Sequence, residues 1–95
     1  MIGVITRLTV KAGANAAFEA AMQPIIAKVR SDEPGNKLCA LYKLPDANGY
    51  ILLQRYDDEA ALETHRATPH FQELRLMLVD HLASRPDAQV MQEVV

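Results

Sequence analysis

A strand pattern passes directly into two successive helical patterns between residues 54 and 71. Alternating apolar residues lead into this segment, and the pair Asp57-Asp58 ends the alternation. Helical periodicity then begins, breaks at Thr68-Pro69 and resumes, because threonine caps a new helix and proline fits its first position. Two of the three histidines, His65 and His70, lie beside this break. In any fold of this chain, a strand that ends at this Asp-Asp pair must therefore be followed by two consecutive helices.

The remaining segments alternate between strand and helix periodicities. The expected strands cover residues 2–10, 37–44, 50–56 and 88–95, and the expected helices cover about 18–29, 59–67 and 68–82. Pro24 lies inside the first helix, where its missing N–H predicts a kink or an early end. The order is β-α-β-β-α-β, which predicts an α+β ferredoxin-like unit with helices on one face of a four-stranded antiparallel sheet. With 95 residues, we expect a single domain spanning 1–95.

Composition and charge disfavour several classes of protein. The net charge of -2 comes from scattered residues without a basic stripe, so nucleic acid is not an expected partner. The longest aliphatic run, 76–79, is too short to span a bilayer, and no membrane partner is expected. The single cysteine, Cys39, has no internal disulfide partner and is expected to be a small buried hydrophobe. These features together predict a cytoplasmic protein.

The sheet face away from the helices is expected to be unusually apolar. Apolar candidates for this face, which also carries Arg7, are Ile5, Ile51 or Leu53, and Val94 or Val95. An exposed apolar sheet face favours association with another chain. We therefore expect a homodimer that packs sheet against sheet.

His65 and His70 are the main candidates for acid–base chemistry, because imidazole titrates near neutrality. Their spacing of five, with a proline between them, does not place two ligands on one helical face, so no metal site is expected. His70 is the stronger candidate for a catalytic base, since the positive end of a helix favours a neutral ring. His81 is expected at the surface. A purely structural role for both His65 and His70 remains the alternative.

Other candidates concern substrate binding. Gln54 and Tyr56 share a strand face, so an amide and a phenol would project to the same side. Phe18, Met22 and Phe71 are either core residues or the wall of a pocket between helices and sheet. A glycine-rich phosphate loop is absent, so nucleotide, flavin and nicotinamide fingerprints are missing.

With this element order, the local motifs resemble the antibiotic biosynthesis monooxygenase family. The markers are Leu8-Thr9-Val10-Lys11-Ala12-Gly13, Glu33-Pro34-Gly35, Tyr56-Asp57-Asp58-Glu59-Ala60-Ala61-Leu62 and His65-Arg66-Ala67-Thr68-Pro69-His70-Phe71. The resemblance implies a dimeric α/β barrel formed by the sheets. It also implies oxygenation of an electron-rich aromatic without metal, flavin or haem, so no cofactor is expected.

The chain departs from the family pattern at several positions. Gln54 stands where glutamate is usual, Cys39 where a tyrosine commonly follows the Glu-Pro-Gly turn, and Asn36 where a cysteine is usual. The haem-degrading relatives carry asparagine, tryptophan and a histidine ligand at positions that match Thr6, His65 and Arg75 here. With all three changed, the resemblance disfavours haem degradation.

The resulting hypothesis is a cofactor-independent monooxygenase that acts with O2 on a small quinol-like or polyphenolic substrate. His65 or His70 would help to deprotonate the phenol, while Thr6, Gln54 and Tyr56 would orient the substrate oxygens. The alternative is a small-molecule-binding or structural dimer without turnover.

Overall fold

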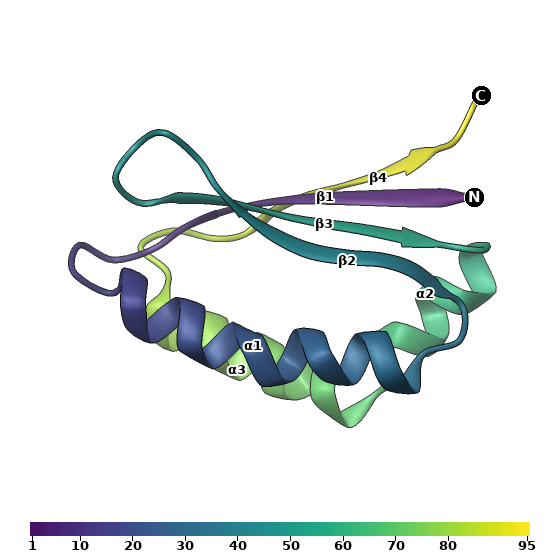
Figure 1. Ribbon diagram of the computed structural model, residues 1–95, viewed down its shortest axis with the longest axis horizontal. Coiled ribbons are helices and arrows are strands. Elements are labelled where there is room, and N and C mark those ends of the chain that lie inside the picture. The colour runs from purple at the N-terminus through teal and green to yellow at the C-terminus, as the bar shows by residue number, and fades with distance from the viewer.

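The computed structural model describes all 95 residues and shows a sheet with helices on one side (Figure 1). The elements, in chain order, are β1 (Ile2–Thr9), α1 (Asn15–Asp32), β2 (Asn36–Lys43), β3 (Gly49–Tyr56), α2 (Glu59–Arg66), α3 (Pro69–His81) and β4 (Asp87–Gln92). The expected α+β ferredoxin-like order is confirmed, with the second helical layer divided into α2 and α3. The last strand is shorter than expected, because pairing ends at Gln92.

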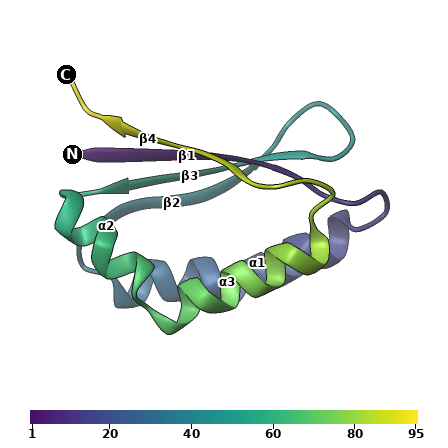
Figure 2. The ribbon, with the colours of Figure 1, turned by 180° about the vertical axis from the view of Figure 1, so that it is seen from behind.

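All strand pairs are antiparallel, in the order β2-β3-β1-β4. The three helices lie on the same side of this sheet, as the two opposite views show (Figures 1 and 2). Helix α1 packs on β2, and α2 packs on β3, whereas β4 is exposed throughout its length. The helical layer therefore covers the β2 side of the sheet and leaves the β4 edge open.

Helix α1 continues through Pro24, so the expected early end there was wrong. Proline removes a hydrogen bond to the carbonyl four residues earlier, at Ala20. Both Pro24 and Ala20 are exposed, so water can bond that carbonyl. The opposite side of α1 buries Phe18, Met22 and two further apolar residues against the sheet. Burial of this face outweighs the local loss of one hydrogen bond.

The break between α2 and α3 forms as the sequence predicts. Asp58 caps α2 by accepting a hydrogen bond from the Ala61 N–H, at 2.9 Å. Thr68 caps α3 by accepting one from the Phe71 N–H, at 3.2 Å, with Pro69 in the first turn. Two helix ends therefore meet at this point, with His65 in the last turn of α2 and His70 in the first turn of α3.

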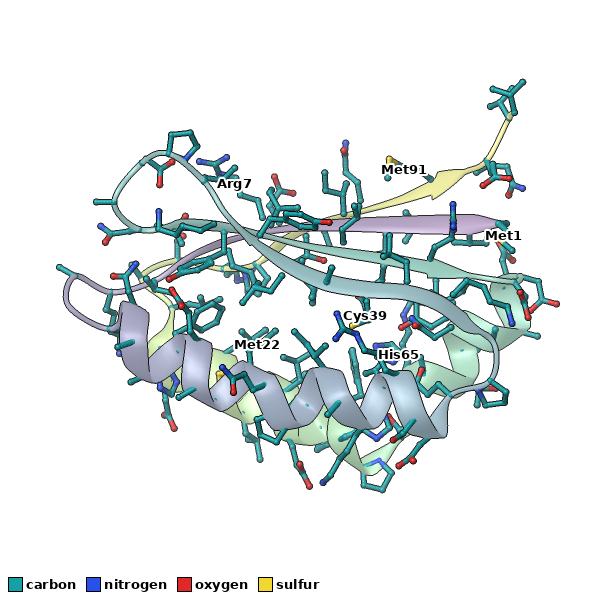
Figure 3. The ribbon with its side chains drawn as sticks, in the orientation of Figure 1. Met1, Arg7, Met22, Cys39, His65 and Met91 are labelled. Atoms are coloured by element: carbon teal, nitrogen blue, oxygen red, sulfur yellow. The ribbon has the colours of Figure 1, made fainter.

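Alternation along β1 and β3 divides the sheet into two chemically different faces. The helix-covered face buries Thr6, Leu8, Leu52 and Gln54, while Arg7 is exposed on the other face. Figure 3 shows Arg7 and Met91 projecting away from the helices. The uncovered face is largely apolar and carries Ile5, Leu38, Ala40, Tyr42, Ile51, Leu53 and Met91. Val94 and Val95 follow the end of β4 and are exposed.

None of the helices has the length and apolar content needed to cross a bilayer.

Candidate active site

Glu33 is a buried carboxylate at the end of α1, with only 7% of its surface exposed. It is the C-terminal capping residue of the helix, and its backbone N–H donates to the Val29 carbonyl at 3.2 Å. The negative end of a helix disfavours an acidic side chain. A buried carboxylate at this position therefore needs hydrogen-bond donors from elsewhere in the fold.

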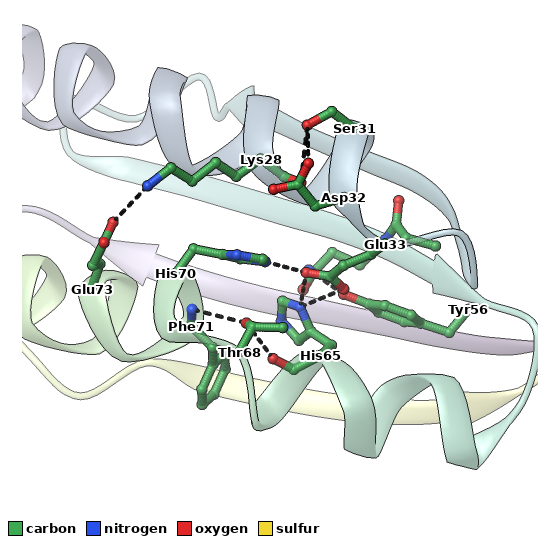
Figure 4. Close-up of polar contacts among 12 residues, drawn as sticks. Lys28, Ser31, Asp32, Glu33, Tyr56, His65, Thr68, His70, Phe71 and Glu73 are labelled. Atoms are coloured by element: carbon green, nitrogen blue, oxygen red, sulfur yellow. Dashed lines mark hydrogen bonds and ion pairs between the residues drawn. The ribbon is translucent and has the colours of Figure 1, made fainter.

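Two histidines supply these donors. His65 Nδ1 lies 2.9 Å from both Glu33 Oε1 and Oε2, and His70 Nε2 contacts Oε2 (Figure 4). The two imidazoles are as buried as the carboxylate, at 3% and 6% exposed. We refer to Glu33, His65 and His70 as the Glu-His-His cluster. It joins the ends of three helices that are separate in the sequence.

The hydrogen bonds define the tautomers of both rings. A carboxylate can only accept, so His65 donates through Nδ1–H and His70 donates through Nε2–H. In the neutral ring, His65 therefore keeps its unprotonated lone pair on Nε2, which has no protein hydrogen-bond partner. This is the arrangement in which a carboxylate orients an imidazole and fixes its tautomer.

His65 lines a cavity of about 260 Å³ between the sheet and the helices α2 and α3. The wall is mainly apolar and includes Val4, Leu8, Leu52, Leu62, Phe71, Leu74 and Leu78. Its volume is near the roughly 300 Å³ at which small-molecule sites begin, which suits one or two aromatic rings. The Phe71 ring meets His65 edge-on, with centroids 5.1 Å apart. The cavity thus places an imidazole beside an apolar space.

A few polar groups interrupt this apolar wall. Thr6 and Gln54 approach from the sheet, and Arg66 and Arg75 approach from the helices. Both arginines are exposed, and Arg66 forms an ion pair with Glu63 at 2.8 Å. Few convergent polar groups in an apolar pocket are typical of sites that orient a small ligand.

The candidate residues from the sequence fall into two groups. Thr6, Gln54, His65 and Phe71 line the cavity together. His70 does not line it, because its ring contacts the far side of the cluster through Glu33. Of the two histidines of the cluster, only His65 therefore lines this cavity.

The other three candidates also lie outside the cavity wall. Tyr56 is fully buried behind Gln54, while Phe18 and Met22 belong to the packed core beside Tyr50. Phe18 is therefore a core residue in this structure, whereas Met22 belongs to the core and also lines a separate cavity of about 450 Å³ between α1 and the sheet.

Tyr56 and Cys39 extend the polar environment behind the cavity. Gln54 Nε2 donates to the Tyr56 hydroxyl at 2.9 Å, and the Tyr56 ring lies 5.2 Å from His65. Burial raises the pKa of the Tyr56 phenol, and the Glu33 carboxylate raises it further. Burial also raises the pKa of the Cys39 thiol to about 11. Both groups therefore stay protonated at neutral pH, and Cys39 is buried as expected.

Sequence reasoning missed Glu33, which was recognised only as part of a turn. The available signal was an acidic residue at a helix C-terminus, where it opposes the helix dipole. The spacing of His65 and His70 was judged along one helix, yet the two rings meet a carboxylate from a third element. The ligand atoms of the Glu-His-His cluster lie within 4.8 Å of one another, close enough to suit a metal ion.

His81 is half-buried instead of lying on the surface, so that expectation was wrong. Its Nδ1–H donates to the Met77 carbonyl at 2.9 Å, which ties the ring back onto the last turn of α3.

Comparison with known proteins assigns this architecture. The model of the family described as antibiotic biosynthesis monooxygenase matches residues 1–75. Among curated proteins, the chain is similar to Rv0793 of Mycobacterium tuberculosis, which is itself named as a monooxygenase only provisionally. The two are 31% identical over 87 residues, covering 92% of this chain and 84% of the relative.

Solved structures show the same fold. A protein from Caulobacter crescentus, provisionally assigned to antibiotic biosynthesis monooxygenases, superimposes with a TM-score of 0.93 at 27% identity, covering 99% of this chain and 90% of the other. SnoaB, a cofactor-independent oxygenase from Streptomyces nogalater, gives a TM-score of 0.85 at 22% identity, covering 97% and 91%. At that identity, SnoaB supports a shared fold alone.

Proposed function

Because this chain belongs to the antibiotic biosynthesis monooxygenase family, we propose that it oxygenates a small quinol-like or polyphenolic aromatic with O2. The observation that carries the proposal is the position of His65, whose free Nε2 belongs to a ring on the cavity wall while its Nδ1 is held by Glu33. The substrate itself would supply the electrons, so the protein needs only to bind, orient and deprotonate it.

The chemistry balances without a further reductant. A quinol loses its phenolic proton to His65, which makes the ring a stronger electron donor toward O2. One oxygen atom then enters the ring and the other leaves as water, giving a hydroxylated quinone. The four electrons that O2 accepts all come from the substrate. The apolar wall keeps bulk water from the reacting ring.

The residues of the cluster take different parts in this proposal. His65 accepts the proton at Nε2, and the Glu33 carboxylate stabilises the imidazolium that forms. His70 acts as a positioning residue, because its Nε2–H fixes the carboxylate from the other side. Two donors hold Glu33 in one orientation, so the lone pair of His65 stays directed for proton transfer.

Thr6 and Gln54 are the proposed contacts for substrate oxygens. The Thr6 hydroxyl has no protein hydrogen-bond partner and lines the cavity from β1. Gln54 lines it from β3, and its amide is fixed by the donation to Tyr56. In this proposal Tyr56 supports Gln54 and does not touch the substrate, whereas Phe71 packs against the aromatic ring.

The direct test is oxygen uptake by metal-stripped protein with a panel of hydroquinones and polyphenols. We expect at least one substrate to consume O2 and yield a hydroxylated quinone in equal amount. Saturable ligand binding without oxygen uptake by any substrate would instead favour the small-molecule-binding alternative. The His65→Gln variant separates protein catalysis from autoxidation, since autoxidation does not depend on that side chain.

The same proposal includes a homodimer formed through the uncovered sheet face. Its apolar side chains, including Ile5, Ile51 and Leu53, occupy a face that no element of this chain covers. Light scattering should give about twice the chain mass of 10.5 kDa. Ile5→Glu should shift the mass toward the monomer, because an unpaired charge buried in the interface would weaken association by several kcal/mol. Gln72→Glu, on the exposed side of α3, is the matched control, and a monomeric parent protein would remove this interface.

A further inference from the structure

We propose that the Glu-His-His cluster is a binding site for a divalent transition-metal ion of the zinc type. The site goes beyond the proposed oxygenase, which needs no metal. It stands on three observations: the donor set of Glu33, His65 and His70, their mutual distances, and a second cavity that reaches the cluster from outside.

The ligand atoms need to move by no more than about 1.5 Å relative to one another to accept an ion. Zinc binds imidazole nitrogen and carboxylate oxygen at about 2.0–2.2 Å, so neighbouring ligand atoms lie roughly 3.3 Å apart. His65 Nδ1 is 2.9 Å from each Glu33 oxygen, and the whole set of ligand atoms lies within 4.8 Å. An ion would replace the three N–H···O contacts by three metal bonds, and ligand atoms as far apart as 4.8 Å would have to approach by about 1.5 Å.

The donor chemistry selects the class of ion. Two imidazoles and one carboxylate suit zinc and its neighbours in the transition series, whereas magnesium and calcium prefer oxygen ligands throughout. With both rings neutral, the cluster carries one negative charge in a site that is more than nine-tenths buried. A bound cation would compensate that charge, and a water or ligand atom would complete four-coordination.

A possible route for an ion reaches Glu33 from a cavity that shares no lining residue with the cavity beside His65. A separate cavity of about 190 Å³ is lined by Glu33 together with Asp32, Thr64 and Thr68. These residues place a carboxylate and two hydroxyl-bearing side chains along the path, which favours a partly hydrated cation. The ion can therefore approach Glu33 without passing through the apolar wall that Phe71 and Leu74 form.

Metal binding has a defined consequence for the proposed oxygenase, and this part of the inference rests on that function. An ion on His65 Nδ1 requires the neutral ring to carry its proton on Nε2. The lone pair that would accept the substrate proton is then lost. Zinc bound to His65 Nδ1 should therefore inhibit oxygenation.

The binding test uses the untagged, metal-stripped protein and titrates it with Zn²⁺ and with Co²⁺ alone. We expect one ion per chain, with visible d–d absorption of four-coordinate cobalt. Glu33→Gln and His70→Gln should each weaken binding by about 100-fold or more, beyond the ~10–100-fold typical of residues that only support a ligand. His81→Gln, the matched histidine control outside the cluster, should leave it unchanged. Absence of binding, or equal weakening by His81→Gln, would overturn the site.

Nitrogen NMR of the histidine rings in the unmutated protein gives an independent test, in case a variant fails to fold. Zinc should move the signals of His65 Nδ1 and His70 Nε2, with His81 unaffected. Movement of His81 alone would overturn the assignment. Neither binding measurement needs a substrate, so the proposal of a metal site is tested independently of the proposed oxygenase activity. If an active quinol is found, one equivalent of Zn²⁺ should abolish its turnover, and undiminished turnover of zinc-loaded protein would overturn the inhibitory role.

Discussion

The two tyrosines at the ends of β3 lie on the same face of one strand, yet they belong to different kinds of environment. Tyr50 packs against Phe18, with ring centroids 4.8 Å apart, and its hydroxyl bonds Glu19 and Asn15. Tyr56 packs against His65 and accepts a hydrogen bond from Gln54. Both tyrosine rings are buried, so the degree of burial does not distinguish the two ends of β3.

The difference lies in what covers each tyrosine. The side of a continuous helix, α1, covers Tyr50, and it presents Phe18 to the ring and Asn15 and Glu19 to the hydroxyl. Helix ends gather near Tyr56, and helix ends bring polar groups and turns that a helix side does not. The comparison teaches that the buried Glu-His-His cluster arises where the helical layer is interrupted, whereas Tyr50 at the other end borders a separate cavity of about 450 Å³. Tyr50 and Phe18 belong to the main packed core, and the interrupted end carries the cluster and the cavity beside His65.

The largest expected effect tests whether side chains are packed more tightly around Phe18 than around Phe71. Phe18→Ala should reduce the free energy of unfolding by about 3–5 kcal/mol, because it leaves a void in a fully buried cluster. Phe71→Ala should cost clearly less, since Phe71 is only half-buried and borders an existing cavity. Urea unfolding followed by circular dichroism measures both values. Equal losses would mean that the cavity end is packed as tightly as the Tyr50 end.

The next effect tests the chemistry of the interrupted end. With an active quinol, His65→Gln should lower kcat by roughly 10²-fold or more, the lower end of general-base contributions. His70→Asn should lower it less, by about 10-fold, because His70 acts through Glu33 and does not line the cavity. Steady-state oxygen uptake measures both, and the dimer mass should stay constant. A larger loss of kcat in His70→Asn would identify His70 as the base. That outcome would agree with its position at the start of a helix, where the sequence analysis expected a neutral ring.

The fold was predictable because it depends on periodicity, which the sequence records directly. Alternation defined β1 and β3, and the Thr68-Pro69 pair located the start of α3 within a residue. Helix α1 does not end early at Pro24, which was one of the two outcomes expected there, because sequence rules do not weigh a local hydrogen bond against burial of a whole helix face. His81 departed from expectation, because its ring folds back onto the Met77 carbonyl, a contact that depends on side-chain direction.

The candidate site was only partly predictable, because its geometry depends on helix ends meeting in space. Thr6, Gln54 and Phe71 were already candidates from the sequence, and all three line the cavity. Glu33 was missed since it lies more than thirty residues before both histidines, and no local pattern links them. The division between His65 and His70 also needed the structure, because only the position of Glu33 between them shows which ring borders the cavity.

A pH-dependent effect should arise from Cys39, which pairs with Gln54 at the interrupted end. The thiol pKa is raised by burial from 9.0 to about 11 in the folded protein. Below pH 9 the thiol is protonated in both states, so it contributes no pH dependence. Above pH 9 the unfolded chain ionises while the folded protein does not, and stability falls by about 1 kcal/mol per pH unit up to pH 11. Urea unfolding at pH 8, 9, 10 and 11 should show a shallower decline in Cys39→Ala than in the parent protein, and parallel declines would contradict this assignment.

The smallest expected effect compares the two tyrosine hydroxyls directly. Tyr56→Phe removes the acceptor of the buried Gln54 amide, and an unpaired buried donor costs about 1–3 kcal/mol. Tyr50→Phe removes hydrogen bonds to Glu19 and Asn15, whose polar groups are near solvent and can bond water instead, so its cost should be about 1 kcal/mol or less. Chemical unfolding of both variants at pH 7 avoids phenol ionisation, because burial raises the pKa of each phenol above its usual value. A larger loss at Tyr50 would contradict the contrast, since the polar network would then contribute more at the packed end than beside the Glu-His-His cluster.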